Sequence, residues 1–226
     1  MCIEDVNLPT YSKKEEIWNA TSHGLGALFG FVALILMLFK TIPAGDIFKI
    51  ISSIIYGLSL IILFSISCIY HSLKPSNSKR ILRILDHNAI YILLAGSYTP
   101  YTLVALRTAD VWGCGEGTIG YIILGSVYFL CIIGVIFNLL NMDKYAWVSM
   151  ICYLLGGWAI ITAIVSLWNI IGPLASWLLI GSGIAYTIGS VLYCYGKRTP
   201  YMHTVFHFFV LVGAILMFCS IYFFVL

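Results

Sequence analysis

Two histidines four residues apart are the first feature of this sequence that could do chemistry. They are His203 and His207 in the stretch YMHTVFHFFVL, at the start of an otherwise apolar run. Residues i and i+4 share one face of a helix, so both imidazoles can reach the same point. His71 ends another apolar run at a similar depth and is a candidate for a third ligand. Three neutral histidines around one ion, with the fourth position left open, are typical of a catalytic zinc site.

Two further polar residues fall close to the candidate third ligand. Ser67 precedes His71 by four residues, so its hydroxyl lies one helical turn deeper on the same face. Asp86 begins the next apolar run, where a carboxylate is costly unless a cationic or hydrogen-bonding group faces it. The alternative is an HxxxH pair that arises by chance, with His23 and His87 as ordinary membrane-interface residues. The common depth of five polar residues favours a metal site over this alternative; they are His71, His203, His207, Ser67 and Asp86.

The elements that must position these groups are membrane helices. Of the 226 residues, 61% are hydrophobic and only 9% are charged, whereas a soluble domain carries about 25% charged residues. A bilayer core about 30 Å thick needs about 20 apolar residues per helical span. Lipid offers the backbone no hydrogen-bond partners, and barrel strands would alternate polar and apolar residues, so the spans are expected to be helices. The apolar runs predict seven of them, near residues 21–40, 49–71, 84–106, 118–141, 145–168, 173–195 and 201–225.

The domain organisation that follows is simple. Residues 1–20 are polar, mixed in charge and without the basic start and short apolar core of a secretory signal, so they are expected to remain as a cytoplasmic segment. Residues 21–226 form one seven-transmembrane domain, because every connection between spans is short. Small residues such as Gly26 and Gly30 predict close contacts between helices, and Pro100 predicts a kink near the end of the third span.

The positive-inside rule orients the bundle. With the N-terminus in the cytoplasm, nine of the twelve Lys and Arg residues fall on the inner side (Lys13, Lys14, Lys74, Lys79, Arg80, Arg83, Lys144, Lys197 and Arg198). The outer side holds Lys40, Lys49 and Arg107. This bias predicts a cytoplasmic N-terminus, an external C-terminus and a metal site toward the cytoplasmic face.

Several function classes are disfavoured by the same sequence. A net charge of +3, scattered along the chain, gives no basic patch for nucleic acid. Residues 201–226 contain no lysine, so the last span cannot form a retinal Schiff base as in a rhodopsin. The spans hold few ionisable groups outside the cytoplasmic cluster, and no internal repeat is evident, which argues against an ion or solute transporter.

The arrangement resembles the PAQR family, and more closely its bacterial branch, the haemolysin III-related membrane proteins. The resemblance lies in Ser67 and His71 on the second span, Asp86 on the third, and His203 and His207 on the seventh. The opening EEIWNATSHGLGA is similar to the first motif of that branch through Glu16, Asn19, Thr21 and His23, and LAGSYTPY in the third span also fits. The resemblance covers essentially the whole chain.

The resemblance implies a seven-helix bundle with Zn²⁺ held by His71, His203 and His207, and with Asp86 and Ser67 around the metal-bound water. The adiponectin receptors and the more distant alkaline ceramidases are associated with amide hydrolysis of ceramide-like lipids. Bacterial members are named for haemolysis and are linked to membrane lipid homeostasis. A location in the bacterial plasma membrane follows from the same resemblance.

We therefore expect a zinc-dependent hydrolase of lipid amides or esters, whose partners are membrane lipids entering from the bilayer. Zinc would lower the pKa of water and polarise the carbonyl group. Asp86 would act as general base and then as general acid, or would only orient water or a ligating histidine. Two alternatives remain open: a non-enzymatic, zinc-stabilised sensor or regulator, and a cytolysin as the name of the bacterial branch implies.

Overall fold

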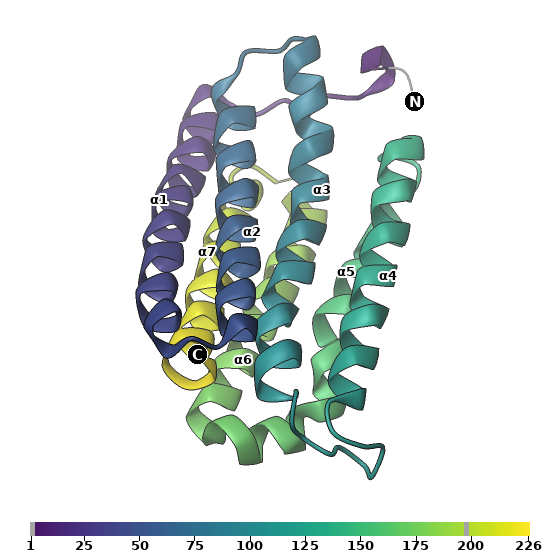
Figure 1. Cartoon of the computed structure of the whole chain (residues 1–226). Helices are drawn as coiled ribbons and strands as arrows, with labels where there is room; N and C mark the ends of the chain where they lie inside the picture. The colour runs from purple at the N-terminus through teal and green to yellow at the C-terminus, as the bar shows by residue number, and fades with distance from the viewer. Residues whose placement is uncertain (1–2, 197–198) are drawn as a thin grey trace.

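The computed structural model describes residues 3–196 and 199–226, and in them the chain is all-helical (Figure 1). Four short helical segments accompany the long helices, namely the 3-10 helices Ile3–Asp5 and Ala159–Ala163 and the π-helices Tyr101–Ala105 and Ile221–Val225. The seven α-helices of the described residues are α1 (Lys13–Ala44), α2 (Ile47–Ser72), α3 (Asn77–Pro100), α4 (Thr118–Asn141), α5 (Ala146–Trp158), α6 (Ile164–Gly196) and α7 (Met202–Ser220).

Five helical stretches of the described residues are long and apolar enough to cross a membrane: Lys13–Ala44, Ile47–Ser72, Thr118–Asn141, Ala146–Cys194 and Met202–Val225. The helical membrane architecture is thereby confirmed, whereas the count of seven spans and the orientation of the termini stay predictions. Lys197 and Arg198, which contribute to the predicted orientation, lie outside the described residues.

Two features explain why five stretches rather than seven stand out. Helix α3 carries Lys79, Arg80, Arg83 and Asp86 in its first ten residues, which lowers its apolar character. The stretch Ala146–Cys194 has 49 residues, about 74 Å at 1.5 Å per residue and far more than one bilayer core. It is interrupted at Gly172, whose φ of 84° and ψ of 167° are not helical. The interruption falls between the predicted spans 145–168 and 173–195.

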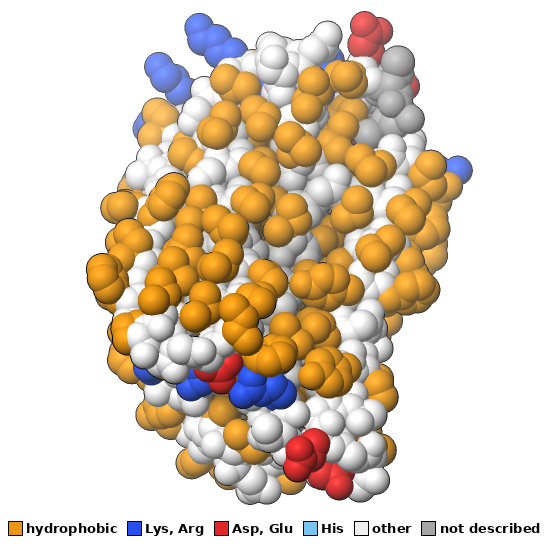
Figure 2. All heavy atoms as spheres, viewed as in Figure 1, with side chains coloured by type: hydrophobic (Ala, Val, Ile, Leu, Met, Phe, Trp, Pro, Cys, Tyr) orange, Lys and Arg blue, Asp and Glu red, His pale blue; other side chains and the backbone are white. Residues whose placement is uncertain are grey.

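The outside of the bundle is apolar. Phe39, Phe129 and Val165 are each more than 60% exposed, and Figure 2 shows apolar side chains covering a wide belt between charged groups near the two ends. The interior, in contrast, buries many small polar side chains, including Ser52, Ser53 and Ser59. A surface of this kind suits contact with lipid rather than water.

Helix α1 lies along both α2 and α7 (Figure 1). A capping box between Ser12 and Glu15 begins the helix. Gly26 permits the close approach of α2, because a Cβ atom at this position would lie only 2.5 Å from the ring of Phe64. The chain then turns at Gly45 in the left-handed conformation, and Asp46 caps the start of α2. The predicted close contact at Gly26 is therefore present.

The predicted distortion at Pro100 is also present, because α3 passes at this residue into the π-helix Tyr101–Ala105. At the opposite end of the bundle, α1 begins, α2 ends and α7 begins close together. The segment before α1 crosses this end (Figure 1): Arg80 Nε donates to the carbonyl of Val6 at 3.2 Å, and the ring of Tyr11 stacks on His203 at 4.9 Å. Burial there raises the pKa of the Tyr11 hydroxyl.

Candidate metal centre

Three buried histidines meet where α2 ends and α7 begins. His71 comes from α2, and His203 and His207 come from successive turns of α7. One ring nitrogen of each lies within 4.8 Å of the others. The Nε2 atom of His203 is 3.3 Å from Nε2 of His71 and 3.1 Å from Nε2 of His207. The structure thus brings together the three residues predicted as ligands, and this group could hold a metal ion.

The three Nε2 atoms cannot satisfy one another. A neutral imidazole has one N–H donor and one acceptor nitrogen, and the burial of these rings leaves water little access to them. A proton shared by two of the nitrogens leaves the lone pair of the third without a partner. A cation at their centre would accept the lone pairs of all three nitrogens. The donor set therefore fits a metal ion better than it fits a hydrogen-bonded trio.

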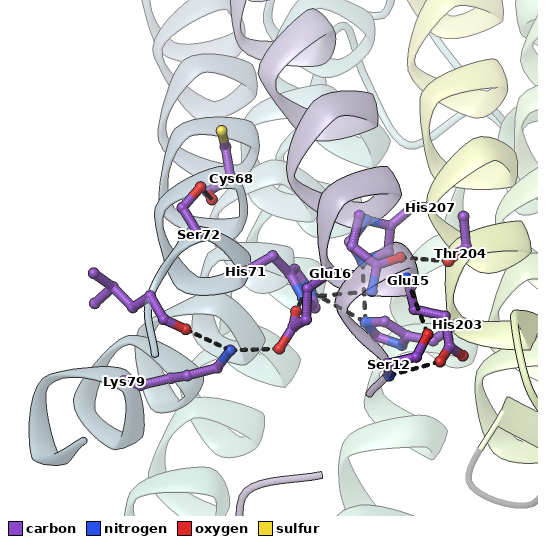
Figure 3. A network of polar contacts seen from close by, with 12 residues as sticks. Ser12, Glu15, Glu16, Cys68, His71, Ser72, Lys79, His203, Thr204 and His207 are labelled. Atoms are coloured by element: carbon purple, nitrogen blue, oxygen red, sulfur yellow. Dashed lines mark hydrogen bonds and ion pairs between the residues drawn. The ribbon is translucent and has the colours of Figure 1, made fainter. Parts of the chain in front are cut away.

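On the side away from the other two histidines, the His71 ring is held by charged residues of α1 and α3 (Figure 3). Its Nδ1 lies 2.6 Å from Oε2 of Glu16, and Lys79 Nζ donates to the other carboxylate oxygen of Glu16 at 2.5 Å. On the side of α7, Thr204 donates its hydroxyl to the side-chain oxygen of Asn19 at 2.6 Å. Polar contacts from α1 therefore reach both helices that carry the histidines.

Ser67 and Asp86 line a cavity together with His207. The Ser67 hydroxyl is buried. Asp86 lies close enough to Ser67 and His71 to interact with both electrostatically. The two residues that we predicted as catalytic are thus beside the histidine group, although their roles stay predictions.

The cavity has a volume of about 170 Å³ and is partly open to the outside. Its polar end holds His207 and Asp86, and its lining continues along α7 to Met217 and across to Leu179 on α6. Met217 is ten residues beyond His207, a rise of about 15 Å along a helix. Most of the lining is aliphatic or aromatic, so the cavity suits a long apolar group with a polar end at the histidines.

His23 on α1 is a fourth histidine of this region. From the sequence we interpreted it as a membrane-interface residue, whereas in the structure it lies beside His207. Its ring stacks on that of His207, with centroids 3.7 Å apart and an interplanar angle of 13°. Both of its nitrogens are buried without a hydrogen-bond partner in the described residues. The spacing of Glu16, Asn19 and His23, at i, i+3 and i+7, puts all three on one face of α1 and could have indicated this cluster.

His87 has a different environment. Its Nε2 lies 2.9 Å from the hydroxyl of Tyr193, and its Nδ1 lies 3.0 Å from the carbonyl oxygen of Arg83. It lines the cavity but is not one of the three clustered histidines.

Comparison with known proteins agrees with the resemblance seen in the motifs. A family model described as haemolysin-III related matches residues 11–218. Hemolysin-3 of Bacillus cereus is 34% identical over 223 residues, covering 99% of this chain and 97% of the relative. The Hemolysin-3 homolog of Bacillus subtilis (strain 168) is 34% identical over 214 residues, with 95% and 96% coverage. The human monocyte to macrophage differentiation factor, a PAQR-type protein, is 26% identical over 176 residues, which are 76% of this chain and 69% of that protein.

The match extends from the segment before α1 through most of α7, so it includes every residue of the histidine group. Both the apolar helices and this relationship support a multi-pass integral membrane protein. The chain therefore belongs to the haemolysin-III related family of membrane proteins.

Proposed function

We propose that this protein is a zinc-dependent hydrolase of lipid amides or esters, acting on membrane lipids in the bacterial plasma membrane. The observation that carries the proposal is that three buried histidine nitrogens converge and that one of these residues, His207, lines a mostly apolar cavity together with Asp86 and Ser67. A lipid hydrolase needs this combination, since the reactive groups must meet a carbonyl while the acyl chain stays out of water.

Zinc is the proposed metal because the ligands are neutral imidazoles. With Zn–N distances of about 2.0–2.1 Å, a tetrahedral site places its nitrogens about 3.4 Å apart, close to the observed separations of 3.1 and 3.3 Å. Three protein ligands leave one position of a tetrahedral site open, as catalytic sites do. When bound, zinc would supply Lewis acidity toward the carbonyl group and would lower the pKa of water to about 7.

The residues of the chain have separate parts in the proposed reaction. Asp86 takes a proton from the attacking water and later delivers it to the leaving amine or alcohol. The water oxygen becomes bonded to the carbonyl carbon, and the bond from that carbon to the leaving nitrogen or oxygen breaks. Ser67 has a buried hydroxyl, which donates a hydrogen bond to the oxygen that becomes negatively charged. The apolar lining holds the acyl chain and excludes water from it.

The test uses the purified protein in lipid nanodiscs with a panel of N-acyl and O-acyl lipids. Free fatty acid release is measured by mass spectrometry, and zinc content by elemental analysis. Asp86→Asn should retain its zinc and lose turnover, and Ser67→Ala should retain its zinc and lose about 10²–10³ in turnover. Asp110→Asn in the loop between the π-helix Tyr101–Ala105 and α4 is the matched control and should behave as the unaltered protein. Full turnover by Asp86→Asn would refute the assignment of the base.

The two alternatives give different results in the same preparations. A zinc-stabilised regulator would bind about one zinc per chain and lose stability on chelation, but would release no fatty acid from any lipid of the panel. The printed name of the Bacillus cereus relative, Hemolysin-3, motivates a leakage assay with dye-filled liposomes. Leakage that persists in Asp86→Asn would favour cytolysis without hydrolysis.

A further inference from the structure

The outer side of the proposed metal centre contains a carboxylate that has no part in the reaction described above. Glu16 on α1 contacts the Nδ1 atom of His71 at 2.6 Å, and the opposite nitrogen of the same ring, Nε2, faces His203 at 3.3 Å. Figure 3 shows Glu16 and Lys79 on one side of His71, with the two α7 histidines beyond it. One ring thus joins a carboxylate to the group of metal-facing nitrogens.

We propose that Glu16 is a positioning residue that fixes both the orientation and the tautomer of His71 as a metal ligand. The inference rests on the metal binding of the proposed function but not on hydrolysis. An ionised carboxylate accepts hydrogen bonds and donates none, so a contact of 2.6 Å with Glu16 requires the proton of His71 on Nδ1. In the neutral ring that a metal requires, Nε2 then keeps its lone pair toward the other histidines. A carboxylate behind a ligating imidazole also raises the basicity of that ligand.

The neighbouring amide of Asn19 favours the other tautomer of His71, so a second group must determine which tautomer is present. The side-chain nitrogen of Asn19 is 3.5 Å from the same Nδ1 atom. As a donor, this amide would favour the opposite tautomer, with the proton on Nε2 and no lone pair for the metal. The contact with Glu16 is shorter by almost an ångström and carries a full charge, so it determines the tautomer. Without Glu16, the amide of Asn19 would be the remaining polar neighbour of Nδ1 among the described residues.

Glu16 is itself held in place through its second oxygen. Lys79 Nζ donates to Oε1 of Glu16 at 2.5 Å and to the carbonyl of Leu73 at 2.9 Å, and it lies 5.1 Å from the centre of the Tyr70 ring. Only 3% of Lys79 is exposed. The carboxylate is therefore fixed at both oxygens, and α1, α2 and α3 all contribute to the orientation of one imidazole.

A purely structural account is the competing explanation, in which Glu16 only joins α1 to α3 through Lys79. Metal affinity and the stability of the metal-free protein separate the two accounts. The experiment uses the full chain in nanodiscs, with Zn²⁺ affinity from competition against a chelating dye and with visible absorption after loading with Co²⁺. Thermal unfolding of the chelator-treated protein reports the structural contribution.

Glu16→Gln should weaken Zn²⁺ binding by about 10- to 100-fold, as removal of such partners does in other zinc sites. The Co²⁺ absorption should change, because the geometry at His71 is no longer fixed. Glu15→Gln is the matched control: Glu15 is the adjacent residue, but it accepts from the backbone N–H groups of Ser12 and Tyr201 rather than from a ring. Its Zn²⁺ affinity should remain within about threefold of the unaltered protein, a margin far below the loss expected for Glu16→Gln.

A double-mutant cycle with His71→Ala completes the test. If Glu16 acts through the ring, Glu16→Gln should produce no further loss of Zn²⁺ affinity once His71 is absent. Unchanged Zn²⁺ affinity in Glu16→Gln, or an equal loss in the His71→Ala background, would overturn the proposal. A lower unfolding temperature of the metal-free Glu16→Gln protein with normal Zn²⁺ affinity would leave only the structural account. Failure of hydrolysis with intact Zn²⁺ binding would refute the proposed enzyme and leave this inference standing.

Discussion

Removal of the metal should lower the thermal stability of this protein by a measurable amount. The proposed ligands are distant in sequence, since His71 and His203 are 132 residues apart. Loss of the helix packing therefore separates His71 from the α7 pair, and the unfolded chain keeps no preformed three-ligand site. A ligand that binds only the folded state stabilises it by about 2.7 kcal/mol when its free concentration is 100 times its dissociation constant.

This free energy converts into a shift of the unfolding temperature. For chains of 150–250 residues, 1 kcal/mol corresponds to about 2–4 °C. Zinc at that concentration should therefore raise the midpoint by about 5–11 °C over the chelated protein. The His203→Ala, His207→Ala double variant should show no such shift, because it keeps only one of the three proposed ligands, His71.

The measurement is intrinsic-fluorescence thermal unfolding in nanodiscs at buffered free Zn²⁺ concentrations, with elemental analysis of the same samples. His87→Gln is the control, because this histidine lies outside the clustered group and bonds to Tyr193 instead; its zinc shift should be retained. A full zinc shift in the double variant would show that the ion binds elsewhere. No zinc and no shift in the unaltered protein would refute the metal centre itself.

Two other predictions concern the helices that support the site. Gly134→Ala on α4 should destabilise the protein by about 1–3 kcal/mol, because its Cβ would lie 2.0 Å from the ring of Tyr91. Gly125→Ala on the same helix is the control: its Cβ would have nothing within 4 Å, so this variant should be neutral or slightly stabilising. Thermal unfolding compares the two variants, and equal effects would contradict the packing argument. Asp46→Ala should lower the free energy of unfolding by about 1–2 kcal/mol, because it removes both the α2 cap and the 3.0 Å ion pair with Arg107. Asp46→Asn keeps the cap and should lower this free energy by less. A larger loss of stability in the asparagine variant would contradict these separate contributions of cap and ion pair.

The ion pair at Asp46 also gives a pH dependence whose sign is fixed. Hydrogen bonds from Arg107 hold the pKa of the Asp46 carboxyl below its usual range. A carboxyl with a depressed pKa in the folded state contributes stability that is present above its ordinary value near 3.8 and is lost as the pH falls through the lowered pKa. The contribution of Asp46 is therefore complete at neutral pH and disappears only in strong acid.

Much of the architecture could be predicted from the sequence because it depends on local pattern. Apolar runs of about 20 residues specify helices in lipid, since no other backbone conformation satisfies its own hydrogen bonds there. The predicted boundary between residues 168 and 173 coincides with the break at Gly172, where a positive φ and a following proline interrupt the helix. The pairing of His203 with His207 was equally local, because the geometry of one helix places i and i+4 on the same face.

The surroundings of the site could not be predicted in this way. His23 stacks on His207, and Glu16 contacts His71 across 55 residues, although a single helix pattern relates neither pair. In a membrane protein the lipid-facing and the buried faces are both largely apolar, so hydrophobic periodicity does not say which helices are neighbours. That choice depends on close contacts such as Gly26 against Phe64, which set how near α1 lies to α2.

The sequence by itself determined that this protein lies in a membrane, that it is helical, and which residue types could hold a metal. These properties follow from composition and from the 3.6-residue periodicity of a single helix. Only the tertiary structure decided that His71 faces the α7 pair, that Glu16 and Lys79 lie behind it, and that His207 lines a mostly apolar cavity. Those relations are set by side-chain packing between helices distant in the chain, and they exist only once the bundle has formed.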